Sequence, residues 1–457
     1  MLLQSIKVKS LEENTYGTGN LDLTPLISFL QKILLKNGEK LKRLPQSVLE
    51  LIQETEEAFS SLNQDNLASY KEVFEMIYLF ENGLRVEEKG IWALGYPVPQ
   101  EVFYGTEDFY GLFDYNTQLV PKTKNKNVTP IKQLLYSVIL ERFYGVPNRN
   151  KILTYTVTKD QVTYFYELSI DFTFVDITRV SELPIINLAS LRDKEEYSPE
   201  DLEPIFEVLD PKKFEFTGFT LLKFQDKTQA YNAERLRTLT TELSDTDPEI
   251  FFDKLHKALS DITQNSKITC SLLPLGKLNG YPIASTGCDI NSIFFREIQK
   301  KLKTGDLDQD ITAYLENPFP IISGVETSLD TEHPVFRKII ERKRLASYIC
   351  IPLRHRKDLV GFLELYSIIP DLLGKKSLLM WHEYLPLLTH LTAEILAVFK
   401  TELERVILDN FTALNPAVQW RFNEVAANHL TPAWLRPPRL SGRLSSKRST
   451  PSTVPLT

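Results

Sequence analysis

The sequence predicts an α+β protein in which a C-terminal antiparallel sheet is flanked by helices and is preceded by a helical bundle and a β-meander. Residues 345–367 carry two apolar runs, separated by the charged residues 355–358, and such a pair of runs indicates a β-hairpin. Residues 152–177 alternate with a period of two, which is typical of strands. Elsewhere, apolar residues recur every three or four positions, which is typical of amphipathic helices.

Length and composition restrict the classes of protein to consider. A chain of 457 residues suggests two to three domains. The net charge of −7 gives no reason to expect nucleic acid as a partner. No apolar stretch approaches the ~20 residues of a transmembrane helix, and no apolar leader is found near residue 1, so no membrane is expected. Three cysteines, an odd number, favour a cytoplasmic protein without a disulfide framework.

Residues 1–150 are expected to form a helical region. The first helix begins near Thr24, which can cap it, and Pro25, which suits a first helical position. Further helices are expected after Pro45, over 67–81 and over 131–143. Residues 91–118 are rich in aromatics. These rings are expected to pack onto the helices, and an aromatic ligand cage is the alternative.

A β-rich meander is expected over 151–226, with strands at 153–157, 162–170 and 172–177 and a turn at 159–161. One further strand is expected over 214–224. Residues 227–246 predict a connector helix. Pro248 then begins a helix with one apolar face, and strands follow at 267–275 and 320–323, with helices at 291–302 and 334–343. The hairpin, a loop at 368–374 and a long helix from Lys375 complete the order.

The hairpin has a serine, an apolar strand ending in Pro-Leu, a charged turn, and a strand with an early glycine and a late Glu-Leu. These residues are Ser347, Pro352, Leu353, Gly361, Glu364 and Leu365. The pattern resembles the last two strands of a GAF domain, of the bacterial and non-catalytic type. The loop departs from the family, because Leu372 and Leu373 stand where phenylalanine and acidic residues are usual. The resemblance assigns 247–408 to the domain, and a PAS-like or unrelated α+β fold stays open.

The resemblance implies a non-enzymatic sensory or regulatory protein that binds a small molecule between the sheet and its middle helices. The residues expected to line that pocket are Phe294, Phe295, Val325, Ile351 and Glu364. The sequence identifies no ligand or cofactor, and a filled core without a pocket is an equal alternative. The terminal helix is expected to relay the signal to a protein partner or to a second copy of the chain. A structural dimerisation module without a ligand is the main alternative function.

An enzymatic alternative is a cysteine-based reductase of free methionine sulfoxide, since some GAF proteins use clustered cysteines. The three cysteines, Cys270, Cys288 and Cys350, do not match the family's catalytic loop, and buried cysteine usually serves as a small apolar residue. No phosphate-binding loop, nucleophile elbow or metal-binding spacing of histidines is found. We therefore expect no catalytic residues and no metal.

The end of the chain divides into a segment at 409–430 and a basic tail at 431–457. From Val425 onward there is no acidic residue, and such a composition favours disorder. Binding to nucleic acid or to an anionic membrane is a second interpretation of the charge. A third interpretation is that the tail belongs to a truncated form of a longer protein.

Overall fold

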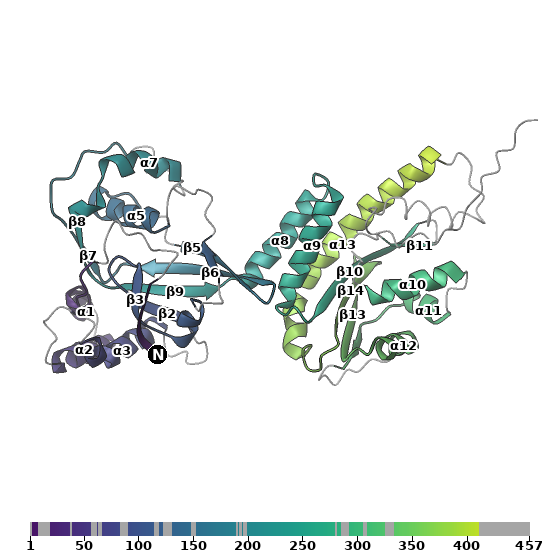
Figure 1. The fold of residues 1–457 in the computed structure, drawn as a ribbon, viewed down its shortest axis with the longest axis horizontal. Helices are drawn as coiled ribbons and strands as arrows, with labels where there is room; N and C mark the ends of the chain where they lie inside the picture. Colours follow the sequence, from purple (N-terminus) through teal and green to yellow (C-terminus); the bar gives the residue numbers. More distant parts are fainter. Residues whose placement is uncertain are drawn as a thin grey trace, which may run out of the picture. The chain divides into compact units, whose positions relative to one another are not determined.

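The structure is a computed structural model that divides the chain into two compact units, Met1–Tyr231 and Asn232–Thr457. The division lies within helix α8 (Thr228–Glu242) (Figure 1). Both units combine helices with antiparallel sheets, which confirms the predicted α+β class. The structure describes residues 2–7, 19–36, 39–55, 62, 66–82, 90–113, 118–121, 130–147, 152–188, 191, 194, 199–278, 281–284, 292–304, 309–324 and 333–410.

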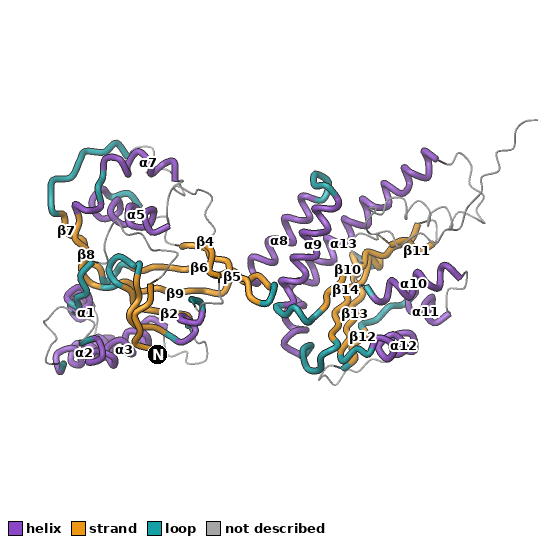
Figure 2. Tube along the Cα trace, in the orientation of Figure 1, coloured by secondary structure: helices purple, strands orange, loops and turns teal. Residues whose placement is uncertain are grey.

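The N-terminal unit is built on a seven-stranded antiparallel sheet with the order β1-β3-β2-β9-β6-β5-β4 (Figure 2). Two more strands, β7 (Val175–Arg179) and β8 (Phe214–Gly218), form a separate antiparallel pair. The strands of the large sheet are β1 (Leu2–Lys7), β2 (Ile91–Gly95), β3 (Glu101–Gly105), β4 (Gln118–Pro121), β5 (Ile152–Lys159), β6 (Val162–Asp171) and β9 (Thr220–Asp226).

Helices cover both faces of this sheet. Side chains of successive strand residues point to opposite faces, and in β2 Trp92 packs with α1–α3 whereas Ala93 packs with α5 and α7. The helices are α1 (Thr24–Lys36), α2 (Glu39–Glu54), α3 (Lys71–Asn82), α4 (Glu107–Gly111), α5 (Pro130–Tyr144) and α7 (Pro199–Val208), with short 3-10 turns at Leu67–Tyr70 and Pro211–Lys213.

The structure corrects the expected helical region and meander in three respects. Residues 1–150 also supply four strands, β1–β4, to the same sheet as β5 and β6. The strand expected over 172–177 leaves that sheet and pairs as β7 with β8. The single strand expected over 214–224 is two, β8 and β9, because Gly218 has a positive φ of 121°. A Cβ there would lie 2.0 Å from the carbonyl oxygen of Phe174, so the bend requires glycine.

The C-terminal unit has a five-stranded antiparallel sheet with the order β11-β10-β14-β13-β12. The expected order of helices and strands is confirmed, with an additional strand, β11, and an additional helix, α11. The elements are α9 (Pro248–Thr263), β10 (Thr269–Leu278), β11 (Tyr281–Ala284), α10 (Ile293–Thr304), α11 (Gln309–Glu316), β12 (Ile321–Ser323), α12 (Pro334–Lys343), β13 (Ser347–His355), β14 (Asp358–Ser367) and α13 (Lys375–Asn410).

The two faces of this sheet have different coverings (Figure 2). Helices α8, α9 and α13 pack on one face, against alternate residues such as Leu363 and Leu365 of β14. Helices α10, α11 and α12 pack on the other face, against residues such as Phe362. We call these the outer face and the inner face. Helix α13 starts at the predicted Lys375 and contains an exposed proline, Pro386.

A buried carboxylate fastens α8 to α9. Asp261 of α9 has a side chain that is 1% exposed, and it accepts a hydrogen bond of 2.7 Å from Arg235 of α8 and one of 2.9 Å from Lys257. Arg235 also donates to the side-chain oxygen of Asn232. Buried charges are stable in proteins when they are paired in this way. The predicted connector helix is therefore attached to the C-terminal unit by charge as well as by apolar packing.

Candidate functional site

The hairpin β13–β14 brings several of the predicted site residues to the inner face. Cys350 is paired in register with Glu364, and both side chains are directed to the inner face because the alternate residue Phe362 packs there. Phe294 and Phe295 come from the first turn of α10 and are buried against the same face. Three of the five predicted residues, Phe294, Phe295 and Glu364, are therefore brought together.

Glu364 is completely buried and holds the beginning of α10. One carboxylate oxygen accepts hydrogen bonds from the Phe294 backbone N–H at 3.1 Å and from the Tyr348 hydroxyl at 2.5 Å. The other accepts one from the Ser292 hydroxyl. Ser292 in turn accepts a hydrogen bond from the Phe295 backbone N–H at 3.0 Å. A helix has unpaired N–H groups at this end, and here a strand residue supplies the acceptor.

Burial disfavours the charged forms of Glu364 and Tyr348. Desolvation raises the pKa of Glu364 above its ordinary value of 4.5, and the hydrogen bonds from Ser292, Tyr348 and the backbone offset only part of that rise. Desolvation also raises the pKa of the Tyr348 hydroxyl well above its ordinary value, and the neighbouring Glu364 raises it further. Both groups therefore favour their neutral forms, as buried acids do.

Aromatic rings fill the described part of the space between the sheet and α10–α12. Phe294 contacts Phe336 of α12 at a centroid distance of 4.9 Å and Phe362 of β14 at 5.3 Å. Tyr314 of α11 contacts Phe336 at 4.9 Å and Phe362 at 5.9 Å. Such contacts are favourable beyond the area they bury. The described part of this region is thus packed with aromatic rings, as the alternative of a filled core requires.

Two of the predicted lining residues do not join this group. Ile351 packs on the outer face with the residues around α9 and α13, so its placement in the inner pocket was wrong. The reason is the period of two along β13, which puts Ile351 on the opposite face from Cys350. Val325 lies outside the described residues.

The glycine of the resemblance pattern has a steric reason. A Cβ at Gly361 would lie 2.3 Å from the carbonyl oxygen of Leu273 on β10 and 2.8 Å from Cγ2 of Thr392 on α13. Real Cβ atoms do not approach backbone oxygens so closely. Gly361 therefore allows β10, β14 and α13 to meet at one point, and any larger residue would separate them.

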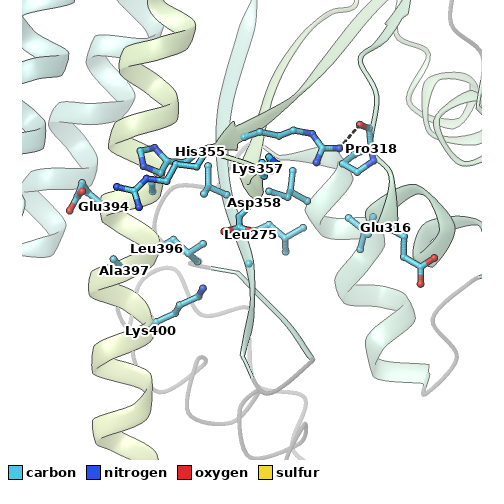
Figure 3. Close-up of a pocket in the computed structure, with 17 residues that line it drawn as sticks. Leu275, Glu316, Pro318, His355, Lys357, Asp358, Glu394, Leu396, Ala397 and Lys400 are labelled. Carbon is cyan, nitrogen blue, oxygen red and sulfur yellow. Dashed lines mark hydrogen bonds between the residues drawn. The ribbon is translucent and has the colours of Figure 1, made fainter.

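A second location, which the sequence reasoning missed, is a cleft at the tip of the hairpin (Figure 3). Its cavity volume is about 760 Å³, and its walls come from the β13–β14 turn, β10, the end of α11 and the later part of α13. Leu275, Leu315 and Leu396 give it apolar walls. The volume lies in the range of pockets that bind small molecules.

Basic side chains surround the mouth of this cleft. Arg356 and Lys357 form the hairpin turn, where Arg356 has a positive φ of 60°. Lys400 extends from α13 towards the middle of the cleft (Figure 3). Within the described part of the chain, none of these three cations has a hydrogen-bonded or ion-paired partner. Arg354 is different, because it donates to the carbonyl oxygen of Pro318 at 3.1 Å.

The cysteines that the structure describes are not arranged for catalysis. Cys270 packs on the outer face and Cys350 on the inner face, and both are buried free thiols. Burial raises the pKa of each thiol well above its ordinary value, which suppresses the reactive thiolate. Cys288 lies outside the described residues.

The described residues also bear on metal binding and on membrane spans. No set of three or more His, Cys, Asp or Glu side chains there is grouped to hold a metal ion. No helix in the same residues has both the length and the apolar character needed to cross a membrane.

In the aromatic-rich stretch, Trp92 and Tyr104 are buried, and they contact Tyr78 and Phe74 of α3. That contact supports packing onto the helices. The segment and tail after residue 410 lie outside the described residues.

Comparisons with known proteins give weak similarity. No protein-family model matches the chain, and no curated protein matches its sequence. Among solved structures, a GAF domain from a phosphoenolpyruvate-protein phosphotransferase of Coxiella burnetii is similar at 15% identity over 38% of this chain and 97% of that one, with a TM-score of 0.24.

Two bacteriophytochrome chromophore-binding domains are also similar. The one from R. palustris is 9% identical over 58% of this chain and 80% of that one, with a TM-score of 0.24. The one from Stigmatella aurantiaca is 10% identical over 59% of this chain and 79% of that one, with a TM-score of 0.20. At these TM-scores the similarity carries no argument about function, so the argument below uses the residues of this chain.

Proposed function

We propose that residues 247–408 form a non-enzymatic regulatory domain of the GAF type, which binds a small molecule and relays its presence through α13. The observation that carries this proposal is the packing of α13 along the sheet that bears the GAF-like hairpin. Leu388, Leu391 and Ile395 of α13 are buried on the outer face. Any rearrangement of the hairpin therefore acts directly on this helix.

The order of elements also supports the proposal. From α9 to α13, the chain follows the sequence of helices and strands that the GAF resemblance implies. Gly361 and Glu364, two residues of the resemblance pattern, have defined roles in joining β14 to α13 and to α10. These contacts give the pattern a structural basis.

The mechanism is a shift between two arrangements of α13. A ligand shifts such an equilibrium only when it binds one arrangement more tightly than the other. A ligand that contacts both the hairpin and α13 meets this requirement, because the two elements move relative to each other when the helix rearranges. The receiver of the signal is a protein partner or a second copy of the chain that contacts α13.

Mass spectrometry of the full-length protein, under native and denaturing conditions, tests the proposal. We expect a mass excess in the native spectrum that disappears on denaturation, and its mass gives the class of the ligand. Hydrogen exchange of α13 is then compared before and after the ligand is removed. Unchanged exchange along α13 would contradict the relay.

A second function, dimerisation without a ligand, is favoured by exposed apolar residues beside and on α13. Ile368 is 70% exposed and Leu379 is 72% exposed. Light scattering distinguishes this function, since it requires a dimer at tens of micromolar that the substitution Leu379→Ser weakens. A monomer in both proteins would exclude it.

The cysteine-based reductase remains the enzymatic alternative. The burial of Cys270 and Cys350 on opposite faces argues against their joint action. The proposal also includes a cytoplasmic location, which the free thiols of these two residues support. Methionine sulfoxide reduction that is lost in Cys350→Ser would overturn the non-enzymatic assignment.

A further inference from the structure

We propose that the cleft at the hairpin tip binds a small amphiphilic anion, with a carboxylate or phosphate at its mouth and an apolar body against its walls. The inference rests on the proposed function for its biological role, whereas binding itself can be measured independently. The site differs from the inner-face pocket that the family resemblance implies, because it lies at the hairpin turn and against the later part of α13.

The first argument is the arrangement of positive charge. Lys400 is only partly exposed, extends into the cleft and has no partner among the described residues. Arg356 and Lys357 are likewise without partners at the hairpin turn. A cation that extends into a cleft can form a charge-assisted hydrogen bond with an anion bound there. An anion in the cleft would supply a counter-charge to α13 and to the hairpin together.

Acidic residues near the cleft do not cancel this charge. Glu394 lies 3.9 Å from His390, a contact that is an ion pair only when the histidine is protonated, and Figure 3 shows its carboxylate directed away from the cleft. Glu316 at the end of α11 is also directed away in that view. Of the acidic residues that line the cleft, Asp358 is the one next to the turn cations.

The second argument is the apolar wall. Leu315, Leu359 and Ala393 line the cleft from α11, β14 and α13 and are partly exposed, above the buried Leu275 and Leu396. A fully hydrated inorganic anion would leave this partly exposed surface without a partner. A ligand with an apolar body buries it, at about 25 cal/mol for each Å² removed from water. The combination of three cations without partners among the described residues and an apolar wall therefore selects an amphiphile.

Calorimetry of the full-length protein with three probes tests the class of ligand. Octanoate carries both an anion and an apolar body, inorganic phosphate carries the charge alone, and octanamide carries the apolar body alone. We expect octanoate to bind at least about tenfold more tightly than either of the others. Equal binding of octanoate and octanamide, equal binding of octanoate and phosphate, or no binding of octanoate would overturn the inference.

Two variants test the location. Lys400→Gln removes one charge-assisted contact and should raise the Kd of octanoate about tenfold or more, while octanamide is unaffected. Ala397→Trp places a large ring on an exposed position of the cleft wall and should weaken both probes about tenfold. The matched controls are Lys338→Gln on α12 and Val398→Trp, the next residue on α13. Neither residue lines the cleft, so both controls should bind octanoate as the wild type does.

The outcomes separate the site from the relay. Octanoate binding that both Lys400→Gln and Ala397→Trp leave unchanged would contradict this site, without affecting the proposed function. Binding that follows the expected pattern, with no change in hydrogen exchange along α13, would establish the site and contradict the relay. Circular dichroism checks that the surface variants Lys400→Gln and Ala397→Trp are folded.

Discussion

Replacement of Glu364 by glutamine tests whether a buried neutral acid holds the beginning of α10. The carboxyl group accepts hydrogen bonds from Ser292, Phe294 and Tyr348. In the neutral acid the hydroxyl oxygen can still accept from Ser292, whereas the glutamine amide nitrogen that replaces it can only donate. Because Ser292 already accepts from the Phe295 N–H, its bond to residue 364 must rearrange in the variant. We expect Glu364→Gln to cost about 1–2 kcal/mol, the scale of one impaired buried hydrogen bond.

The same variant has a predicted dependence on pH. Because the pKa of Glu364 is raised on folding, the folded protein binds a proton more tightly than the unfolded chain. Stability from this group is therefore complete below about pH 4.5 and is lost as the pH rises through the folded-state pKa. Glutamine does not titrate. The stability advantage of the wild type over Glu364→Gln should accordingly shrink as the pH rises.

Hydrogen exchange during urea titration provides the assay, since peptides from β14 and α10 report the opening of the C-terminal unit alone. Titrations between pH 4 and pH 8 compare the wild type with Glu364→Gln, so contributions from other groups cancel in the difference. The variant Glu364→Ala loses all three bonds and is expected to cost about 3–5 kcal/mol. A constant difference between wild type and Glu364→Gln across this range would refute the raised pKa.

Three further outcomes are expected. Asp261→Asn should lower the stability of the C-terminal unit by about 1.5–3 kcal/mol, because it weakens two charge-assisted hydrogen bonds. Hydrogen exchange in α8 and α9 measures this loss. An unchanged exchange rate there would contradict the role of this carboxylate. Gly361→Ala should lower the free energy of unfolding by about 1–3 kcal/mol through overpacking. The control Gly374→Ala, where a Cβ meets nothing within 4 Å, should be nearly neutral. Equal denaturation midpoints of the two variants would refute the steric explanation. Cys270 and Cys350, whose pKa values burial raises, should react with iodoacetamide only as fast as the protein unfolds, and rapid labelling of either thiol at pH 8 would oppose this assignment.

The hairpin was predictable because its local signals agree. Two β-rich runs, a charged turn and a glycine all indicate the same structure, and the strands occur where expected. The turn itself is shorter than expected, since His355 and Asp358 are already paired. This leaves Arg356 and Lys357 as the turn. The positive φ of Arg356 had no sequence signal, because arginine is not a residue that favours it.

Strands β2 and β3 were missed for a different reason. Their sequences, 91–95 and 101–105, are short and nearly fully buried, so they lack the alternation that identifies a half-exposed strand. Buried runs of this length cannot be assigned by periodicity. Neighbouring strands decide their conformation, and β9, which pairs with β2, is more than 120 residues away.

The candidate sites also depend on tertiary structure that the sequence pattern does not reveal. The expected turn at 355–358 pairs Ile351 with Phe362, on the face of Glu364. The structure has a register shift between Leu353 and Arg354, which pairs Cys350 with Glu364 instead and turns Ile351 to the other face. The cleft was not predictable either. Its lining residues come from 275 to 400 and belong to five elements, so only the assembled tertiary structure brings Lys400 to the hairpin turn.

Pro386 has a consequence for the mechanics of α13. Proline has no N–H, so the carbonyl of His382 lacks its partner within the helix. Both residues are on the exposed side, where water can take the missing place. The ladder of backbone hydrogen bonds along α13 is therefore interrupted at Pro386 without leaving a buried unsatisfied group. Local unfolding that starts at Lys375 can end at this position. The later part of the helix, which carries Lys400, can then stay helical when the earlier part unfolds.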